Sequence, residues 1–121
     1  MPARERVQAL VAMVEAGRFV EAIEQFYAED ATMQENNAPP RGPRAKLVEG
    51  EKKTLAAHKE VRTLPGTTFV VEGDVAVIRW RFVFTRQDGT GFRMEELAHQ
   101  RWRGDRIVEE RFFYDPGQIK M

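Results

Sequence analysis

The sequence predicts a single α+β domain over residues 1–121, with helices in its first half and a long antiparallel sheet in its second. Two observations favour this fold class. Apolar residues recur with the 3.6-residue period of amphipathic helices before about residue 60, and with the two-residue period of strands from Thr67 onward. Helices followed by consecutive strands are typical of α+β domains, whereas α/β domains alternate the two elements. A chain of 121 residues also suits one domain, because two would each be too short to bury a useful core.

Three helices are expected before the sheet. The first covers residues of about 3–16 and ends before Gly17, a residue that suits a left-handed helix C-cap. The second covers residues of about 19–28, so that the two form a helical hairpin. A short strand at Ala31–Glu35 and a proline-rich loop follow. The third helix is expected over residues of about 44–60, which are rich in helix-forming residues.

Four longer strands are expected after the third helix. They are bounded by residue pairs such as Gly73-Asp74 and Asp88-Gly89, which are typical of tight hairpin turns. Consecutive hairpins would pair neighbouring strands antiparallel to one another. The expected strands are Thr67–Glu72, Val75–Thr85, Phe92–Trp102 and Arg106–Tyr114.

Alternation along these strands assigns each residue to one of two sheet faces. Placing Trp80, Trp102 and Phe112 together on the face beneath the helices gives a consistent sheet. We call this the concave face. The polar residues that share it are Glu96, Gln100, Glu110 and Tyr114.

The opposite, outer face mixes charged residues with apolar ones. We expect either a solvated surface with cross-strand ion pairs or the interface of a twofold homodimer, because mixed charges with interspersed apolar groups suit self-complementary pairing. Nucleic acid is not an expected partner, since acidic residues alternate with the arginines and the formal net charge is zero. The residues expected on this face are Arg79, Arg81, Glu95, Leu97, His99, Arg101, Ile107, Glu109, Arg111 and Phe113.

The composition argues against several classes of site. The chain has no cysteine, which removes disulfides, thiol nucleophiles and thiolate metal sites. Its two histidines, His58 and His99, lack metal-binding spacing, and no phosphate-binding loop or GxGxxG motif occurs, so neither a metal nor a cofactor is expected. No apolar run approaches the roughly 20 residues that span a bilayer, and the N-terminus has no apolar signal region. A cytoplasmic protein without membrane contact is therefore expected.

Two segments carry a resemblance to a known family. Residues 27–35, YAEDATMQE, lead into a Pro/Gly loop that ends in Arg41-Gly42-Pro43. Residues 100–111, QRWRGDRIVEER, are followed by Phe113-Tyr114-Asp115. They resemble, respectively, the segment entering the pocket and the last hairpin of SnoaL-like (polyketide cyclase-like) proteins. These proteins belong to the nuclear transport factor 2-like superfamily and are related to ketosteroid isomerases.

The resemblance implies a cone-shaped fold in which three helices pack on a strongly curved, mixed and mostly antiparallel sheet. It also implies a deep cavity for a small apolar molecule, and frequent dimers. Polar groups of the concave face would form the polar end of such a cavity if they point inward, since buried polar groups need partners. The residues expected to contact the ligand are Trp80, Phe82, Gln100, Glu110, Phe112 and Tyr114, with His58 from the third helix.

Glu35 is the candidate catalytic residue. It stands where the isomerases carry their general base, a carboxylate at the end of the first strand. Under a hydrophobic roof the pKa of a carboxylate rises toward the range that is useful for proton transfer. Alternatively, the Glu35 side chain turns out to solvent or pairs with Arg41 or Arg44.

Two functions are therefore open. The first is a small-molecule-binding SnoaL-like protein that acts as a cofactor-independent isomerase, cyclase or hydratase through proton transfer by Glu35. The second is a non-catalytic module that binds a hydrophobic ligand or dimerises. A ketosteroid isomerase in the strict sense is disfavoured, because Leu10 and Ala98 match the positions of its two oxyanion donors. Phe112 is likewise nearest to the position of the catalytic aspartate of the cyclases.

Overall fold

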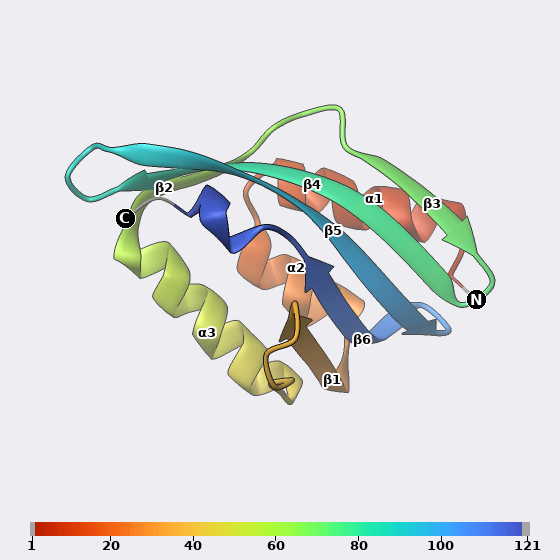
Figure 1. Ribbon diagram of the computed structural model, residues 1–121. Helices are drawn as coiled ribbons and strands as arrows, with labels where there is room; N and C mark the ends of the chain where they lie inside the picture. The colour runs from red at the N-terminus through yellow and green to blue at the C-terminus, as the bar shows by residue number, and fades with distance from the viewer. Residues whose placement is uncertain (1, 120–121) are drawn as a thin grey trace.

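The computed structural model describes residues 2–119 and places three helices on one side of a strongly curved sheet (Figure 1). An α+β fold of this kind, with a mixed and mostly antiparallel sheet, confirms the predicted class. One strand lies between the second and third helices, five strands follow the third helix, and a short 3₁₀ helix lies near the end of the described residues. The elements are α1 (Arg4–Glu15), α2 (Phe19–Phe26), β1 (Tyr27–Glu35), α3 (Arg44–Ala57), β2 (His58–Thr63), β3 (Thr68–Glu72), β4 (Val75–Arg86), β5 (Gly91–Arg103), β6 (Arg106–Phe113) and η1 (Pro116–Gln118).

The first two helices form the predicted hairpin. The apolar stripe of α1 is buried, and Gly17 takes a φ of 81°, the left-handed conformation expected after the helix end. Helix α2 is shorter than predicted, because Tyr27 already has extended backbone angles and begins β1. Strand β1 therefore starts four residues earlier than the predicted Ala31. Tyr27 is therefore a strand residue, and its side chain is buried.

The predicted third helix was too long at its C-terminal end, and β2 was missed. Helix α3 ends at Ala57, and His58 has the extended angles of a strand. Residues from His58 to Thr63 pair antiparallel with the second half of β4. These residues favour a helix locally, but pairing with β4 makes them extended. Such a tertiary effect cannot be recognised from the local sequence pattern. His58 thus opens a strand and does not lie on the helix.

The sheet is mixed, in the strand order β1-β6-β5-β4-β2, and β3 also pairs with β4. Strands β2 and β3 share one edge of the long β4, since β2 pairs with its second half and β3 with its first. Strand β1 lies parallel to β6, and every other pair is antiparallel. Helix α3 packs along β1 and β2, which closes one side of the curved sheet.

A β-bulge in β6 corrects one predicted side-chain direction. Arg101 pairs with Glu109 but Trp102 pairs with Ile107, so Val108 is an additional residue in the strand. Ile107 therefore shares the concave face with Trp102 and is fully buried, although simple alternation placed it on the outer face. Beyond the bulge the predicted assignment holds, because Gln100 pairs with Glu110.

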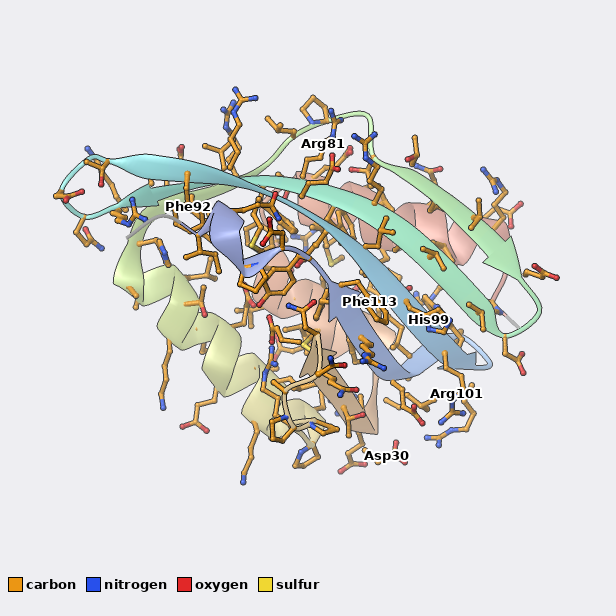
Figure 2. The ribbon with its side chains drawn as sticks, in the orientation of Figure 1. Asp30, Arg81, Phe92, His99, Arg101 and Phe113 are labelled. Carbon is orange, nitrogen blue, oxygen red and sulfur yellow. The ribbon has the colours of Figure 1, made fainter. Side chains whose placement is uncertain are left out.

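The core lies between the helices and the concave face. The largest fully buried side chains include Trp102, Phe26 and Ile78. On the outer face, Leu97 and Phe113 remain exposed and lie opposite one another on β5 and β6. Figure 2 shows His99, Arg101 and Phe113 on the side of the sheet that faces away from α1. None of the described helices is long and apolar enough to cross a membrane.

Candidate functional site

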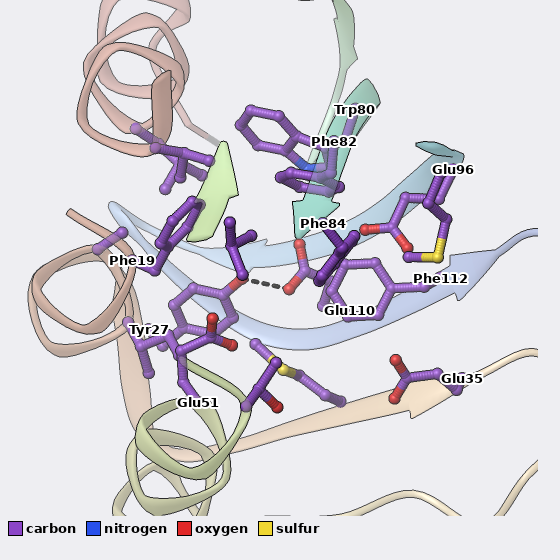
Figure 3. Close-up of a pocket in the computed structure, with 18 of the residues that line it drawn as sticks. Phe19, Tyr27, Glu35, Glu51, Trp80, Phe82, Phe84, Glu96, Glu110 and Phe112 are labelled. Carbon is purple, nitrogen blue, oxygen red and sulfur yellow. Dashed lines mark hydrogen bonds between the residues drawn. The ribbon is translucent and has the colours of Figure 1, made fainter. Parts of the chain in front are cut away.

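A cavity of about 200 Å³ opens between the helices and the concave face (Figure 3). Its walls are mainly apolar. Helices α1 and α2 contribute Leu10, Val14, Phe19 and Ile23, while β4 contributes the aromatic wall of Trp80, Phe82 and Phe84. The polar side chains that line it are Tyr27, Glu35, Arg41, Glu51, Thr54, Glu96 and Glu110.

A buried hydrogen-bond chain ends on Glu110. The indole Nε1 of Trp102 donates to Gln100 Oε1 over 3.1 Å, and Gln100 Nε2 donates to Glu110 Oε2 over 2.6 Å. The Tyr27 hydroxyl donates to the other carboxylate oxygen of Glu110. Because an indole N–H can only donate, it fixes the orientation of the Gln100 amide so that its NH₂ group faces Glu110. Glu110 is therefore the acceptor on which the chain converges.

The surroundings of Glu110 bring the pKa of its carboxyl close to neutral pH. Burial raises the pKa of its carboxyl, and the hydrogen bonds from Gln100 and Tyr27 act in the opposite direction; the result is a pKa of about 7. Burial and the nearby Glu110 raise the pKa of Tyr27 well above its ordinary value, so Tyr27 stays protonated as a donor. A carboxyl with this pKa can both accept and donate a proton at neutral pH.

Glu96 is the second buried carboxyl of the cavity. It lies on β5 opposite Trp80 of β4, and only 6% of it is exposed. No side chain or backbone group among residues 2–119 forms a hydrogen bond with its carboxyl. Burial is the main cause that raises its pKa to about 8, and the nearby carboxyls of Glu110, Glu35 and Glu51 add to it. Glu96 therefore keeps its proton at neutral pH when the cavity holds no counter-charge.

Glu35 lies at the end of β1 and lines the cavity beside the two buried carboxyls. Its side chain forms an ion pair with Arg41, which was one of the alternatives considered for it. About a third of the Glu35 side chain (34%) and half of the Arg41 side chain (49%) are exposed, so the pair lies at the open side of the cavity. Its predicted role as a catalytic base stays a prediction.

The other predicted ligand contacts divide into two groups. Trp80, Phe82, Glu110 and Phe112 line the cavity, whereas Gln100 lies behind Glu110 and is fully buried. Their contact with a ligand remains a prediction.

Tyr114 and His58 are placed outside the lining residues. The backbone N–H of Tyr114 donates to Asn36 Oδ1 over 3.0 Å. The His58 ring lies 5.2 Å from the Phe84 ring, and its Nδ1 is 2.8 Å from the Thr54 carbonyl oxygen. Neither residue lines the cavity, although the two neighbours of His58 named above do. Their contact with a ligand also remains a prediction.

Several lining residues were not among the predicted contacts, and Tyr27 and Glu51 are two polar ones. Tyr27 was assigned to a helix end, and only its place in β1 brings its hydroxyl to Glu110. Glu51 had a detectable signal, because it lies four residues after Leu47 and four before Leu55 and so interrupts the apolar stripe of α3. Burial raises the pKa of Glu51, and the Arg41 cation partly offsets this effect.

A family model described as the SnoaL-like domain matches residues 7–110. The chain belongs to the SnoaL-like family. A comparison with curated proteins gave no match.

Several solved structures share the SnoaL-like fold. A protein from Mesorhizobium loti, assigned as a candidate SnoaL-like polyketide cyclase, is 24% identical with a TM-score of 0.78, and the match covers 94% of this chain and 100% of that one. A protein from Catenulispora acidiphila with a ketosteroid isomerase-like fold, in complex with trimethylamine, is 19% identical with a TM-score of 0.79 and coverages of 97% and 90%. IdmH of Streptomyces antibioticus, a candidate polyketide cyclase, is 21% identical with a TM-score of 0.74 and coverages of 95% and 93%. At these identities the likeness establishes the fold.

Of the four positions that the sequence resemblance matches to catalytic residues of related families, one holds Glu35 and three are apolar in this SnoaL-like chain. Leu10 and Phe112 line the cavity, and Ala98 is fully buried on β5. The polar groups of the cavity come instead from other positions, chiefly Glu96 and Glu110, each two residues before one of these apolar positions on the same face. Within residues 2–119, no group of three or more His, Asp or Glu side chains could hold a metal ion.

Proposed function

We propose that this SnoaL-like protein binds a small, largely apolar molecule in its cavity and transfers a proton on it without a cofactor, as an isomerase, cyclase or hydratase. The observation that carries the proposal is Glu110, a fully enclosed carboxyl with a pKa of about 7 whose two oxygens are oriented by Tyr27 and Gln100. A general acid–base group works best when its pKa lies near the working pH. The apolar and aromatic walls supply a site in which a small ligand can displace water.

In the proposed step, the Glu110 carboxylate removes a proton from a carbon next to a carbonyl group of the substrate. The C–H bond breaks, its electron pair stays on the substrate as an enolate, and the new O–H bond forms on Glu110. The same carboxyl then returns the proton to another atom of the substrate, so that no oxidant or reductant is consumed. Tyr27 and Gln100 act as positioning residues, because they contact Glu110 and not the reacting carbon.

Glu35 is the second candidate base, from the sequence resemblance. It lines the same cavity, but its carboxylate is engaged with Arg41. The two hypotheses differ in which substitution removes the activity. Replacing Glu35 by Gln would abolish proton transfer if Glu35 is the base, and would leave most of it if Glu110 is.

Solvent exchange tests the proposal without knowledge of the product. The protein is incubated in D₂O with a panel of small carbonyl compounds, including cyclic unsaturated ketones, β-keto esters and amino ketones, and deuterium uptake at carbon is followed by NMR. Uptake that depends on the protein and is lost in Glu110→Gln supports the proposal. Compounds that bind but exchange no deuterium would favour the alternative, a non-catalytic ligand-binding module.

The outer face is proposed as a homodimer interface. Leu97 and Phe113 are 46% and 44% exposed and lie opposite one another in the middle of this face. Charged residues of both signs surround them, which suits pairing with a second copy of the same face. The residues proposed for this interface are Arg79, Arg81, His99, Arg101, Glu109 and Arg111.

Analytical ultracentrifugation tests the interface, since Leu97→Asp should convert a dimer to a monomer at micromolar concentration. A wild-type protein that sediments as a monomer would contradict this part of the proposal. The cytoplasmic location expected from the sequence stays a prediction.

A further inference from the structure

The cavity is acidic as well as apolar. Four of its lining residues are glutamates, and Arg41 is the one cation that lines it among the described residues. Arg41 is already engaged with Glu35. The remaining three carboxyls, those of Glu51, Glu96 and Glu110, face the enclosed space without a cationic partner in residues 2–119.

Glu96 is the observation that points to a ligand. A buried carboxyl usually has a hydrogen-bond partner, because leaving it without one costs about 1–3 kcal/mol or more. Only 6% of Glu96 is exposed, yet no described group forms a hydrogen bond with its carboxyl. Figure 3 shows this carboxyl directed from β5 toward the cavity. Its oxygens keep contact with the open space of the cavity, so a molecule bound there can supply a partner.

The surroundings of Glu96 suit an organic cation. Trp80 lies opposite Glu96 in the register of β4 and β5, and its ring stacks on Phe82 with 5.9 Å between the ring centroids. Aromatic faces attract ammonium groups through the negative potential above the ring, and a carboxylate supplies the counter-charge. An anionic ligand would be repelled by those of the three carboxyls that are ionised, and it would raise their pKa values further. A neutral hydrocarbon would leave Glu96 without a partner.

We propose that the molecule bound in this cavity carries an ammonium group, either alkylated or attached to a small apolar body, held between the Glu96 carboxylate and the aromatic wall of β4. This inference rests on the proposed function, because it assigns the substrate class of the same cavity. The volume of about 200 Å³ suits a small amine, since pockets for drug-sized ligands are roughly 300–1,000 Å³. A cation beside Glu110 would also hold that carboxyl in its ionised form, which is the form that a base needs.

The binding of a cation should depend on pH. The titratable and charged groups that face Glu96 come from β6, β1, α3 and the segments next to β1 and β6, whereas α1, α2, β2 and β4 contribute uncharged lining residues. Glu96 holds its proton below a pH of about 8, so a cation has to displace that proton in order to pair with the carboxylate. Affinity for a permanent cation should therefore rise with pH between 6 and 8, with release of protons. The groups facing Glu96 are Glu110, Glu35, Tyr27, Glu51, Arg41 and Tyr114.

Calorimetry with three probes of one shape tests the inference. Choline, 3,3-dimethylbutan-1-ol and 3,3-dimethylbutanoate share a tert-butyl-like head and differ in charge. At pH 8 we expect choline to bind at least about 10-fold more tightly than the neutral alcohol, with the butanoate weakest, and we expect this preference to shrink at pH 6. Titration of choline in two buffers of different ionisation enthalpy should show net proton release.

Matched variants locate the effect. Glu96→Gln keeps the shape of the side chain but removes its charge, so it should remove the preference for choline and the proton release. Glu95→Gln changes the adjacent residue, which lies on the outer face, and should retain both. The proton count in the wild-type protein tests the inference even if Glu96→Gln is too unstable to study.

The outcomes separate this inference from the proposed function. If the neutral alcohol binds as tightly as choline, or the butanoate binds more tightly, the ammonium class is wrong while the cavity remains a binding site. If none of the three probes binds at millimolar concentration, the inference is overturned, whereas the proposed function is judged separately by deuterium uptake into the carbonyl compounds.

Discussion

Glutamates on the two faces of the sheet have opposite environments. Two pairs of consecutive glutamates, Glu95-Glu96 on β5 and Glu109-Glu110 on β6, are divided between the faces by strand alternation. On the outer face, Glu95 pairs with Arg79 over 2.6 Å and Glu109 pairs with Arg101, and all these side chains are about half exposed. On the concave face, Glu96 and Glu110 are buried without a cationic partner in the described chain.

The outer face therefore carries exposed carboxylates paired with arginines, whereas the concave face carries buried carboxyls that lack a cation among the described residues. An exposed carboxylate next to an arginine is stabilised as the anion by water and by the cation. A buried carboxyl without a cation avoids the cost of ionisation by keeping its proton, which raises the pKa of Glu96 to about 8 and that of Glu110 to about 7. The concave face therefore holds two carboxyls that change charge near neutral pH.

The largest expected difference between the faces is in proton transfer. Glu110→Gln should lower the rate of deuterium uptake by about 100- to 10,000-fold, the usual contribution of a general acid–base group. Glu109→Gln removes the adjacent carboxylate on the outer face and should change the rate less than about twofold. Equal losses in the two variants would show that the effect comes from damage to β6 and not from the chemistry of Glu110.

The second difference is in the pH dependence of stability. Folded Glu96 keeps its proton up to a pH of about 8, whereas its ordinary value is 4.5, so the folded state binds more protons than the unfolded state between these values. The free energy of unfolding should therefore fall as pH rises from about 4.5 to 8. One pKa unit corresponds to about 1.4 kcal/mol, so Glu96 alone should account for a loss of a few kcal/mol.

Urea unfolding between pH 5 and 9 measures this effect. Glu96→Gln should flatten the pH profile and be more stable than the wild type at pH 9, whereas Glu95→Gln should keep the wild-type slope. A Glu96→Gln profile that runs parallel to the wild type would contradict the assignment of the proton to Glu96.

A third test concerns the hydrogen-bond chain. Tyr27→Phe removes the hydroxyl that donates to Glu110 and should lower the free energy of unfolding by about 1–2 kcal/mol. Because this hydrogen bond lowers the pKa of Glu110, its loss should also raise that pKa above about 7. The two readouts are urea unfolding and carboxyl NMR, and a stability loss without a shift in the Glu110 titration would indicate a packing effect only.

The smallest effect is expected on the outer face. Arg79→Gln should change the free energy of unfolding of the protomer by less than about 1 kcal/mol, because the side chains of the Arg79–Glu95 pair are 49% and 52% exposed. Chemical denaturation at several salt concentrations measures it. A larger loss that depends on protein concentration would be evidence for the dimer interface proposed there.

Much of the fold could be predicted from the sequence, because it follows from local patterns. The turn pairs and the two-residue period located β3 to β6 within about two residues. Strand β2 was not predicted, because residues 58–60 continue a helix-favouring composition. Only their pairing with β4 makes them extended. The side-chain direction of Ile107 was predicted wrongly, because a one-residue bulge reverses the alternation of side chains between the two faces. We recognised no sequence signal for this bulge.

The candidate site was predictable in part for the same reason. Alternation alone placed Glu96, Gln100 and Glu110 together on the concave face, and the register of β5 and β6 brings Gln100 opposite Glu110. The contact between Tyr27 and Glu110 joins residues 83 positions apart, so it depends on the parallel pairing of β1 with β6 and not on any local pattern. The depth of burial that raises the pKa of Glu96 likewise depends on the complete packing of helices on the sheet.

The difference between the two faces is tested most directly by titrating the two buried carboxyls, Glu96 and Glu110. Glutamate labelled with ¹³C at the side-chain carboxyl can be followed by NMR between pH 3 and 10, and Glu96→Gln and Glu110→Gln assign the two resonances by their loss. From the burial of the two side chains we expect the Glu96 resonance to titrate at about pH 8 and the Glu110 resonance at about pH 7. Titration of both resonances below pH 5 would contradict this expectation.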